Sequence, residues 1–187
     1  MSFLAVSSSH AEMTIQQHNN TASGLAGWIM QNGHIEIQLN PLSQTQAKAF
    51  YLGRGFSEEV ALQIANSCVY QTVVKNISAD DESVSVSVNL ADWKHINDTQ
   101  ETNLPAKQTW LDKWAALGAS NTALLAFKWA TFPSQQIFKL ASDYGWGMIL
   151  FGPDSNENSD EGFDLMVRWQ ENDTAMQQSI RGLNCPQ

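Results

Sequence analysis

The segment from Ser83 to Leu90 constrains the fold of this 187-residue chain more than any other. It alternates Val and Leu with Ser and Asn at a period of two. Because successive side chains of a strand point to opposite faces, this pattern predicts a strand with one face in a core and the other in water. Residues 69–77 are also rich in β-branched and aromatic side chains, and a polar turn at residues 79–82 follows them. We therefore expect an antiparallel hairpin, whose second strand extends to Trp93.

More strands are predicted on both sides of this hairpin. Ile35, Ile37 and Leu39 alternate with polar residues, and the preceding Asn32-Gly33 pair is typical of a hairpin turn that joins them to an apolar segment beginning at Trp28. Short apolar segments bounded by turn residues indicate three further strands, at residues 122–129, 145–152 and 163–169.

Helices are predicted near residues 43–67 and 108–117. Ser43 can cap a first helix that ends at Gly53, and Ser57 can cap a second. Val60, Ile64 and Cys68 recur at a spacing of four, which places them on one buried face with Cys68 near the helix end. In residues 108–117, Trp and Leu side chains recur at helical spacing before a glycine.

These elements predict a mainly β fold with a helical insertion, an antiparallel β-sandwich. We expect a flexible N-terminal segment at residues 1–27 and a single sandwich domain at residues 28–187. The segment Phe163-Asp-Leu-Met-Val-Arg-Trp169, after a polar turn, resembles the late strand of immunoglobulin-like and cupredoxin-like sandwiches. The resemblance is short and implies only such a fold.

The charge of the chain excludes two classes of partner. Its 10 Lys and Arg against 19 Asp and Glu give a formal net charge of −9, with no basic cluster. Such a chain is not suited to bind nucleic acid or an anionic membrane surface. No apolar run approaches the ~20 residues that span a bilayer. We therefore expect a protein or small-molecule partner, whereas the oligomeric state is not predicted by any pattern.

The two cysteines and the N-terminus bear on the compartment. Ser9-His10-Ala11 fits the small-x-small pattern that signal peptidase prefers, which favours a periplasmic or secreted protein. Cys68 and Cys185 would then form a disulfide that closes a long loop and holds the C-terminus. The alternative is a cytoplasmic protein with one buried core thiol and one terminal thiol.

No catalytic constellation is found in the sequence. It contains no GxSxG, SxxK, HExxH or CxxC motif. Its carboxylate pairs, Asp80/Asp81 and Asp160/Glu161, lie in predicted turns and not in a cleft. We therefore expect a non-catalytic binding or accessory module, with a hydrolase of unrecognised site as an alternative.

Copper handling is a second alternative function. His34 and His95 could approach each other on neighbouring strands, with methionines nearby, and imidazole and thioether groups suit copper. His10, Met13 and His18 could bind the ion on the N-terminal arm instead. The competing interpretation is that these histidines are scattered over the surface.

Aromatic residues and one arginine are the candidates for partner binding. Arg54 lies between two glycines, close to Tyr51 and Phe56, where it could hold a carboxylate or stack on a ring. The loops around Trp93 and Trp146 could add contact area, and the glycines that flank Trp146 make it the best candidate for exposure. In the alternative, Arg54 fixes the turn between two helices and the tryptophans belong to the core.

Overall fold

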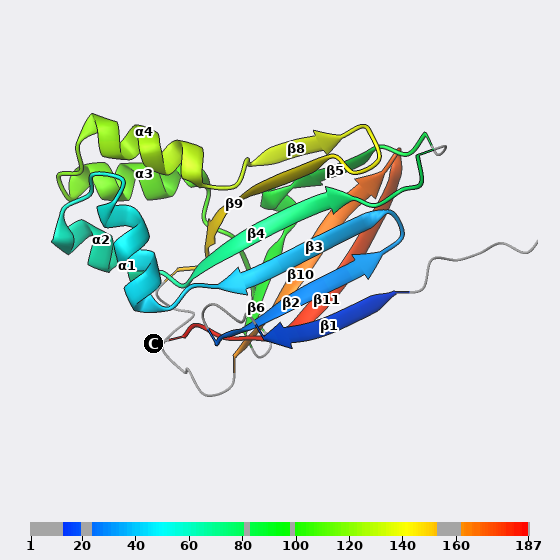
Figure 1. The fold of residues 1–187 in the computed structure, drawn as a ribbon, viewed down its shortest axis with the longest axis horizontal. Coiled ribbons are helices and arrows are strands. Elements are labelled where there is room, and N and C mark those ends of the chain that lie inside the picture. Colours follow the sequence, from blue (N-terminus) through cyan, green and yellow to red (C-terminus); the bar gives the residue numbers. More distant parts are fainter. Residues whose placement is uncertain (1–12, 20–23, 81–82, 98–99, 153–161, 187) are drawn as a thin grey trace, which may run out of the picture.

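Two antiparallel sheets and four helices form the fold in the computed structural model, which describes residues 13–19, 24–80, 83–97, 100–152 and 162–186 (Figure 1). The first sheet has the strand order β1 (Thr14–Asn19), β2 (Ala26–Asn32), β3 (Ile35–Pro41), β4 (Val69–Asn76) and β9 (Tyr144–Leu150). The second has the order β7 (Gln100–Asn103), β6 (Lys94–Asn97), β10 (Phe163–Glu171), β5 (Val86–Asn89) and β8 (Gln135–Phe138), with β11 (Thr174–Leu183) paired to β10.

The two sheets pack face to face and enclose the main core. Both β5 and β6 pair with β10, at Trp169–Glu171 and Asp164–Met166 respectively. The strand β11 pairs with β10 from Phe163 to Glu171. The first two therefore share one side of β10, and β11 forms the opposite edge of the sheet. Inward side chains of both sheets make one buried cluster, which includes Met30, Ile37, Val74, Val88, Val167 and Ile180. The predicted β-sandwich is confirmed.

The helices lie together at one end of the sandwich (Figure 1). They are α1 (Gln44–Leu52), α2 (Glu58–Ala65), α3 (Lys107–Ala116) and α4 (Asn121–Ala130). Tyr51, Trp114 and Phe127 from this layer form a second buried cluster with Val69 and Leu150 from the outer face of the first sheet. At this end β4 and β9 are therefore buried on both faces. No helix in the described part of the chain is long and apolar enough to cross a membrane.

Serine caps determine where three of the helices begin. The Ser43 hydroxyl accepts a hydrogen bond from Gln46 N, and Ser43 N donates one to the Gln46 side chain, which completes a capping box. The side chains of Ser57 and Ser120 cap α2 and α4 by accepting a hydrogen bond from the backbone N of the third helical residue, Val60 and Ala123 respectively. The helices predicted near residues 43–67 and 108–117 are confirmed.

The strand predicted at residues 122–129 is wrong, because this segment forms α4. Ala123, Phe127 and Ala130 are buried at helical spacing, and Ser120 supplies the cap. A short apolar run does not distinguish a strand from a buried helix, and packing against β9 and α3 decides between them here.

The hairpin predicted from residues 69–77 and 83–90 is also wrong. Both segments are strands, but β4 pairs with β3 and β9 in the first sheet, whereas β5 pairs with β10 and β8 in the second. The chain passes from the first sheet to the second after β4, and the buried Asn76 stabilises this passage by donating hydrogen bonds to the carbonyls of Val84 and Phe138. Alternation determines which face of a strand is buried but not which strand it pairs with.

The strand at residues 86–89 does not extend to Trp93 as predicted. A 3₁₀ turn, η1 (Leu90–Asp92), interrupts it before β6 begins at Lys94. Trp169 of β10 pairs with Val88 of β5, and Met166 of β10 pairs with Lys94 of β6. The chain therefore advances six residues, from 88 to 94, alongside an advance of only three residues on β10. The Trp93 indole fills this irregularity and donates a hydrogen bond to Arg168 O at 2.9 Å. That carbonyl lies in the interval where β10 has no strand partner on this side.

The predicted flexible segment at residues 1–27 is only partly described. Thr14–Asn19 form β1, which pairs antiparallel with Ala26–Gln31 of β2. A paired strand thus replaces the expected flexible segment at these residues. The cleavage-like motif at residues 9–11 and His10 lie outside the described residues.

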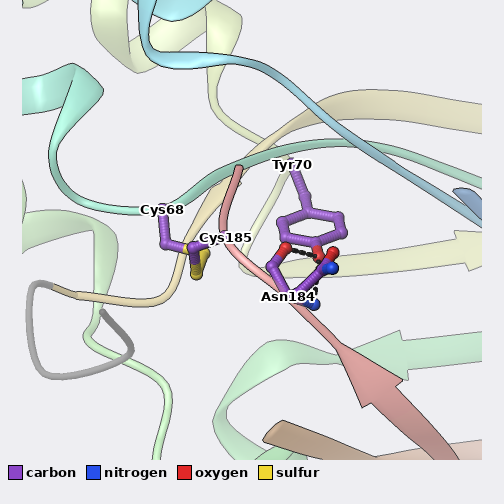
Figure 2. The surroundings of a disulfide bond; sticks show 4 residues. All are labelled: Cys68, Tyr70, Asn184 and Cys185. Atoms are coloured by element: carbon purple, nitrogen blue, oxygen red, sulfur yellow. Dashed lines mark hydrogen bonds between the residues drawn. A yellow bond between two sulfur atoms is a disulfide. The ribbon is translucent and has the colours of Figure 1, made fainter. Parts of the chain in front are cut away.

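The predicted disulfide between Cys68 and Cys185 is confirmed, with the two Cα atoms 5.3 Å apart (Figure 2). Cys68 follows α2 and leads into β4, while Cys185 follows β11. The tail is held at a second point, because the Tyr70 hydroxyl donates to Asn184 O and accepts from Asn184 N. Burial raises the pKa of Tyr70, while the bond to Asn184 opposes the rise, so the hydroxyl remains a donor.

Candidate functional site

Five large apolar side chains are exposed in the segment between residues 129 and 146. Trp129 is 81% exposed, Tyr144 66% and Trp146 50%, and Ile137 and Leu140 are similarly open. They surround the junction of α4, β8 and β9, and we term them the β8–β9 edge. Single exposed apolar side chains are ordinary on protein surfaces, but a group that includes two Trp and one Tyr is typical of an interaction site.

Both strands of this surface are the last strands of their sheets. β9 is the last strand after β4, and β8 the last after β5. Figure 1 shows them next to each other, joined by the loop at residues 139–143. The Asp143 carboxylate fixes this loop by accepting hydrogen bonds from Lys139 N at 3.0 Å and Leu140 N at 2.9 Å. Two sheet edges therefore open on the same side of the sandwich.

The outer backbone groups of β9 are directed away from β4. In an antiparallel strand, one residue directs both its N–H and its C=O toward the neighbouring strand on one side, and the next residue directs both groups toward the opposite side. Phe132 N donates to Met148 O at 2.9 Å, and a β-bridge joins Thr131 to Met148, so Met148 points away from β4. By this alternation Trp146 and Tyr144 also point away from β4.

The same alternation applies to β8. Leu90 N donates to Ser134 O at 2.9 Å, so Ser134 belongs to the set that faces β5. Gln135 and Ile137 lie out of phase with it and direct their backbone groups to the open side. At this edge, residues with outward backbone groups therefore also carry exposed apolar side chains, namely Ile137, Tyr144 and Trp146.

Two glycines explain why the aromatic side chains of β9 lie outside. The strand alternates Tyr144-Gly145-Trp146-Gly147, with the glycines on the inner face. A Cβ at Gly147 would lie 2.4 Å from Phe132 N, and one at Gly145 would lie 3.3 Å from the Phe138 ring. Only glycine at position 147 permits this close approach of the 131–132 segment, and Tyr144 and Trp146 consequently occupy the outer face.

The segment of the chain that contains the β8–β9 edge is basic in an acidic protein. Residues 104–152 hold four Lys and two Asp, a net charge of +2, against −9 for the whole chain. Asp143 is engaged with the loop backbone, and Asp112 accepts a hydrogen bond from Gln108. Lys107 lies in a partly buried position, where it donates to Lys128 O and Thr131 O. Burial and the nearby Lys128 lower the pKa of Lys107.

Of the four aromatic residues proposed from the sequence for partner binding, the structure exposes only Trp146. Trp146 is half exposed, whereas Tyr51, Phe56 and Trp93 are buried, so these three side chains are core residues and not contact surface. Burial raises the pKa of the Tyr51 hydroxyl, and Arg54 opposes the rise. The Arg54 guanidinium lies 3.2 Å from the Phe50 ring centroid and donates to Phe50 O, so it fixes the turn between α1 and α2.

His34 and His95, the candidate copper ligands, lie at different ends of β10. Glu171, at the end of this strand, accepts hydrogen bonds from His34 N and Nδ1. His95 pairs with Leu165, six residues earlier on β10, which corresponds to about 20 Å at ~3.3 Å per residue. The buried His95 ring packs against Phe163 instead. Among the described residues no cluster of three or more His, Cys, Asp or Glu could hold a metal ion.

A polar groove of about 850 Å³ crosses the outer face of the second sheet. Amide side chains, Arg168 and a single carboxylate, Asp92, line most of it, and Ile137 forms one of its walls. The groove therefore adjoins the β8–β9 edge.

The sequence pattern did not single out Ile137, Leu140 or Tyr144, and it favoured a core position for most of the tryptophans, Trp129 among them. The alternation of aromatic residues with glycines at 144–147 was the signal available for Tyr144. Trp129 was placed on the predicted strand that is in fact α4. Comparisons of this chain with models of protein families, with curated proteins and with solved structures found no match.

Proposed function

We propose that this protein is an exported, non-catalytic binding module that recruits a protein partner through the β8–β9 edge. One observation carries the proposal, namely that two neighbouring open sheet edges carry the exposed side chains Ile137, Tyr144 and Trp146. Open edges with apolar side chains invite aggregation, and proteins normally shield them with charges, proline or a covering element. An edge that is left open and aromatic is therefore best explained by a partner that covers it.

The composition of the edge supports a protein partner. Trp and Tyr are the residues that most often dominate the binding energy of protein interfaces, because they bury a large area with few rotatable bonds. The Cys68–Cys185 disulfide supports the exported setting, since such bonds persist in oxidising compartments. Alkylation of thiols in acid-quenched cells tests this setting, and two free cysteines would contradict it.

Site-specific photo-crosslinking in the cells that encode the protein tests the binding role. A benzoyl-phenylalanine at Tyr144 conserves an aromatic ring at the edge, and the same group at Gln16, exposed on β1, serves as the matched control. We expect a defined adduct from position 144 and none from position 16. The absence of an adduct at 144, or identical adducts at both positions, would overturn the proposal.

A further inference from the structure

We infer that the partner binds as an extended segment that carries acidic residues and adds a strand to the open side of β9 at Tyr144–Trp146. The inference rests on the proposed binding function and specifies its mode. It follows from the geometry of the ladder, from the side chains next to the edge and from the charge around it.

The open part of the ladder is short and well defined. Thr131 already pairs with Met148, and Phe132 N donates to Met148 O, so the 131–132 segment occupies the far end of β9 on this side. Tyr144 and Trp146 follow on the same side, each with one N–H and one C=O directed away from β4. An added strand would continue the line begun by residues 131–132 and would make up to four backbone hydrogen bonds, which is the basis of affinity in strand addition.

Side chains on the outer face of the first sheet supply a place for alternate residues of the added strand. Tyr144 pairs with Lys75 and Trp146 with Val73 on β4, so these four side chains lie on one face. A strand beside β9 would place every second side chain next to Tyr144 or Trp146, with Cβ atoms about 5 Å apart. Such contacts favour β-branched or aromatic residues at alternate positions of the partner.

Charge favours an acidic segment over a second copy of this chain. Lys75 lies opposite Tyr144, Lys128 precedes Trp129, and Lys139 lies in the loop that joins β8 to β9. Two copies meeting at this edge would bring the same lysines together, and the two chains, each with a formal net charge of −9, would repel each other. The Asp or Glu side chains of an extended segment would instead lie near these lysines and be attracted to them.

The test uses two pools of synthetic ten-residue peptides with Val, Ile, Phe or Tyr at alternate positions. Intervening positions are Asp, Glu or Ser in one pool and Lys, Arg or Ser in the other. We expect the acidic pool to yield peptides that bind the full chain at least tenfold more tightly than any from the basic pool. On binding, amide hydrogen exchange at Tyr144 and Trp146 should slow at least tenfold, with no such change in β1.

Two substitutions at one position separate the mode of binding from the side-chain contact. Trp146→Thr removes the ring and keeps the N–H, whereas Trp146→Pro removes both at an edge position whose N–H is not bonded to β4. We expect the proline variant to bind the selected peptides at least tenfold more weakly than the threonine variant. Hydrogen exchange on the unmodified chain gives the same answer if the proline variant does not fold.

The outcomes distinguish this inference from the proposed function. Equal binding by the two variants, or unchanged exchange at Tyr144 and Trp146, would overturn strand addition while a crosslink at Tyr144 still supported the binding role. Equal affinity of the two pools would overturn the acidic character of the segment. A dimer that Trp146→Thr dissociates would show that a second copy is the occupant. No binding from either pool, together with no crosslink, would overturn both.

Discussion

Loss of the Cys68–Cys185 disulfide should destabilise the protein mainly by freeing its unfolded state. The two cysteines are separated by 117 residues, so the bond closes most of the chain into one loop. In the chain-entropy treatment, a loop of this length restricts the unfolded state by about 4.9 kcal/mol at 25 °C. Since small domains are stable by ~5–15 kcal/mol in total, Cys185→Ser should remove a large fraction of the free energy of unfolding.

The native structure of the variant should change little. Tyr70 still exchanges two hydrogen bonds with Asn184, next to the substituted position, so the C-terminal tail keeps one anchor (Figure 2). Urea unfolding followed by tryptophan fluorescence measures both the free energy and its dependence on denaturant. We expect a loss of about 4–5 kcal/mol and a larger denaturant dependence, because the unfolded chain without the bond exposes more surface.

A matched variant separates loop entropy from anchoring of the tail. Tyr70→Phe retains the disulfide and removes the two hydrogen bonds to Asn184, and it should cost ~1–3 kcal/mol without changing the denaturant dependence. If Cys185→Ser costs less than Tyr70→Phe, with an unchanged denaturant dependence, the loop-entropy reasoning is refuted.

Three further substitutions test contacts inside the sandwich. Burial raises the pKa of Glu171, but hydrogen bonds from His34 and Trp169 outweigh it and lower the pKa overall. The carboxylate therefore stabilises the fold above its unfolded pKa, and this contribution disappears as the pH falls through the folded pKa. Glu171→Gln should cost ~1–3 kcal/mol at pH 7 and little in acid; equal losses at pH 7 and 3 in urea titrations would contradict this. Thr72→Val should raise the free energy of unfolding by ~0.5–1 kcal/mol, because the buried Thr72 hydroxyl has no hydrogen-bond partner among the described residues; a lower melting temperature would argue against it. Trp93→Phe should cost ~2–4 kcal/mol in urea unfolding, since it leaves a void and an unpaired carbonyl at Arg168, and a loss below ~1 kcal/mol would show that the indole bond is dispensable.

Part of the candidate site could be predicted from sequence. Glycines on both sides of Trp146 predicted its exposure, and Trp146 is half exposed. The same reasoning failed for Tyr51 and Phe56, because both side chains are buried in the helical layer, whereas Arg54 between them is half-buried and donates to Phe50 O. Trp93 was misplaced because its role is to satisfy Arg168 O, a carbonyl on a strand far away in the sequence.

The order of residues along the chain determined the secondary structure of most segments. Period-two alternation identified the buried face of residues 35–39 and 86–89, the serines at 43 and 57 determined two helix starts, and an even pair of cysteines predicted their bond. The strand and helix features can be recognised within a few neighbouring residues. The disulfide could be predicted because the chain contains only two cysteines, so each has a single possible partner.

Tertiary structure alone decided which segments meet. Strand alternation encodes a face but not a neighbour, so the separation of β4 and β5 into different sheets could not be read from their sequences. The helical state of residues 121–130 depended on packing, and the open side of Tyr144 and Trp146 depended on where the 131–132 segment ends its pairing with β9. The physical reason is that pairing and burial are set by contacts between residues distant in sequence, and no local pattern contains them.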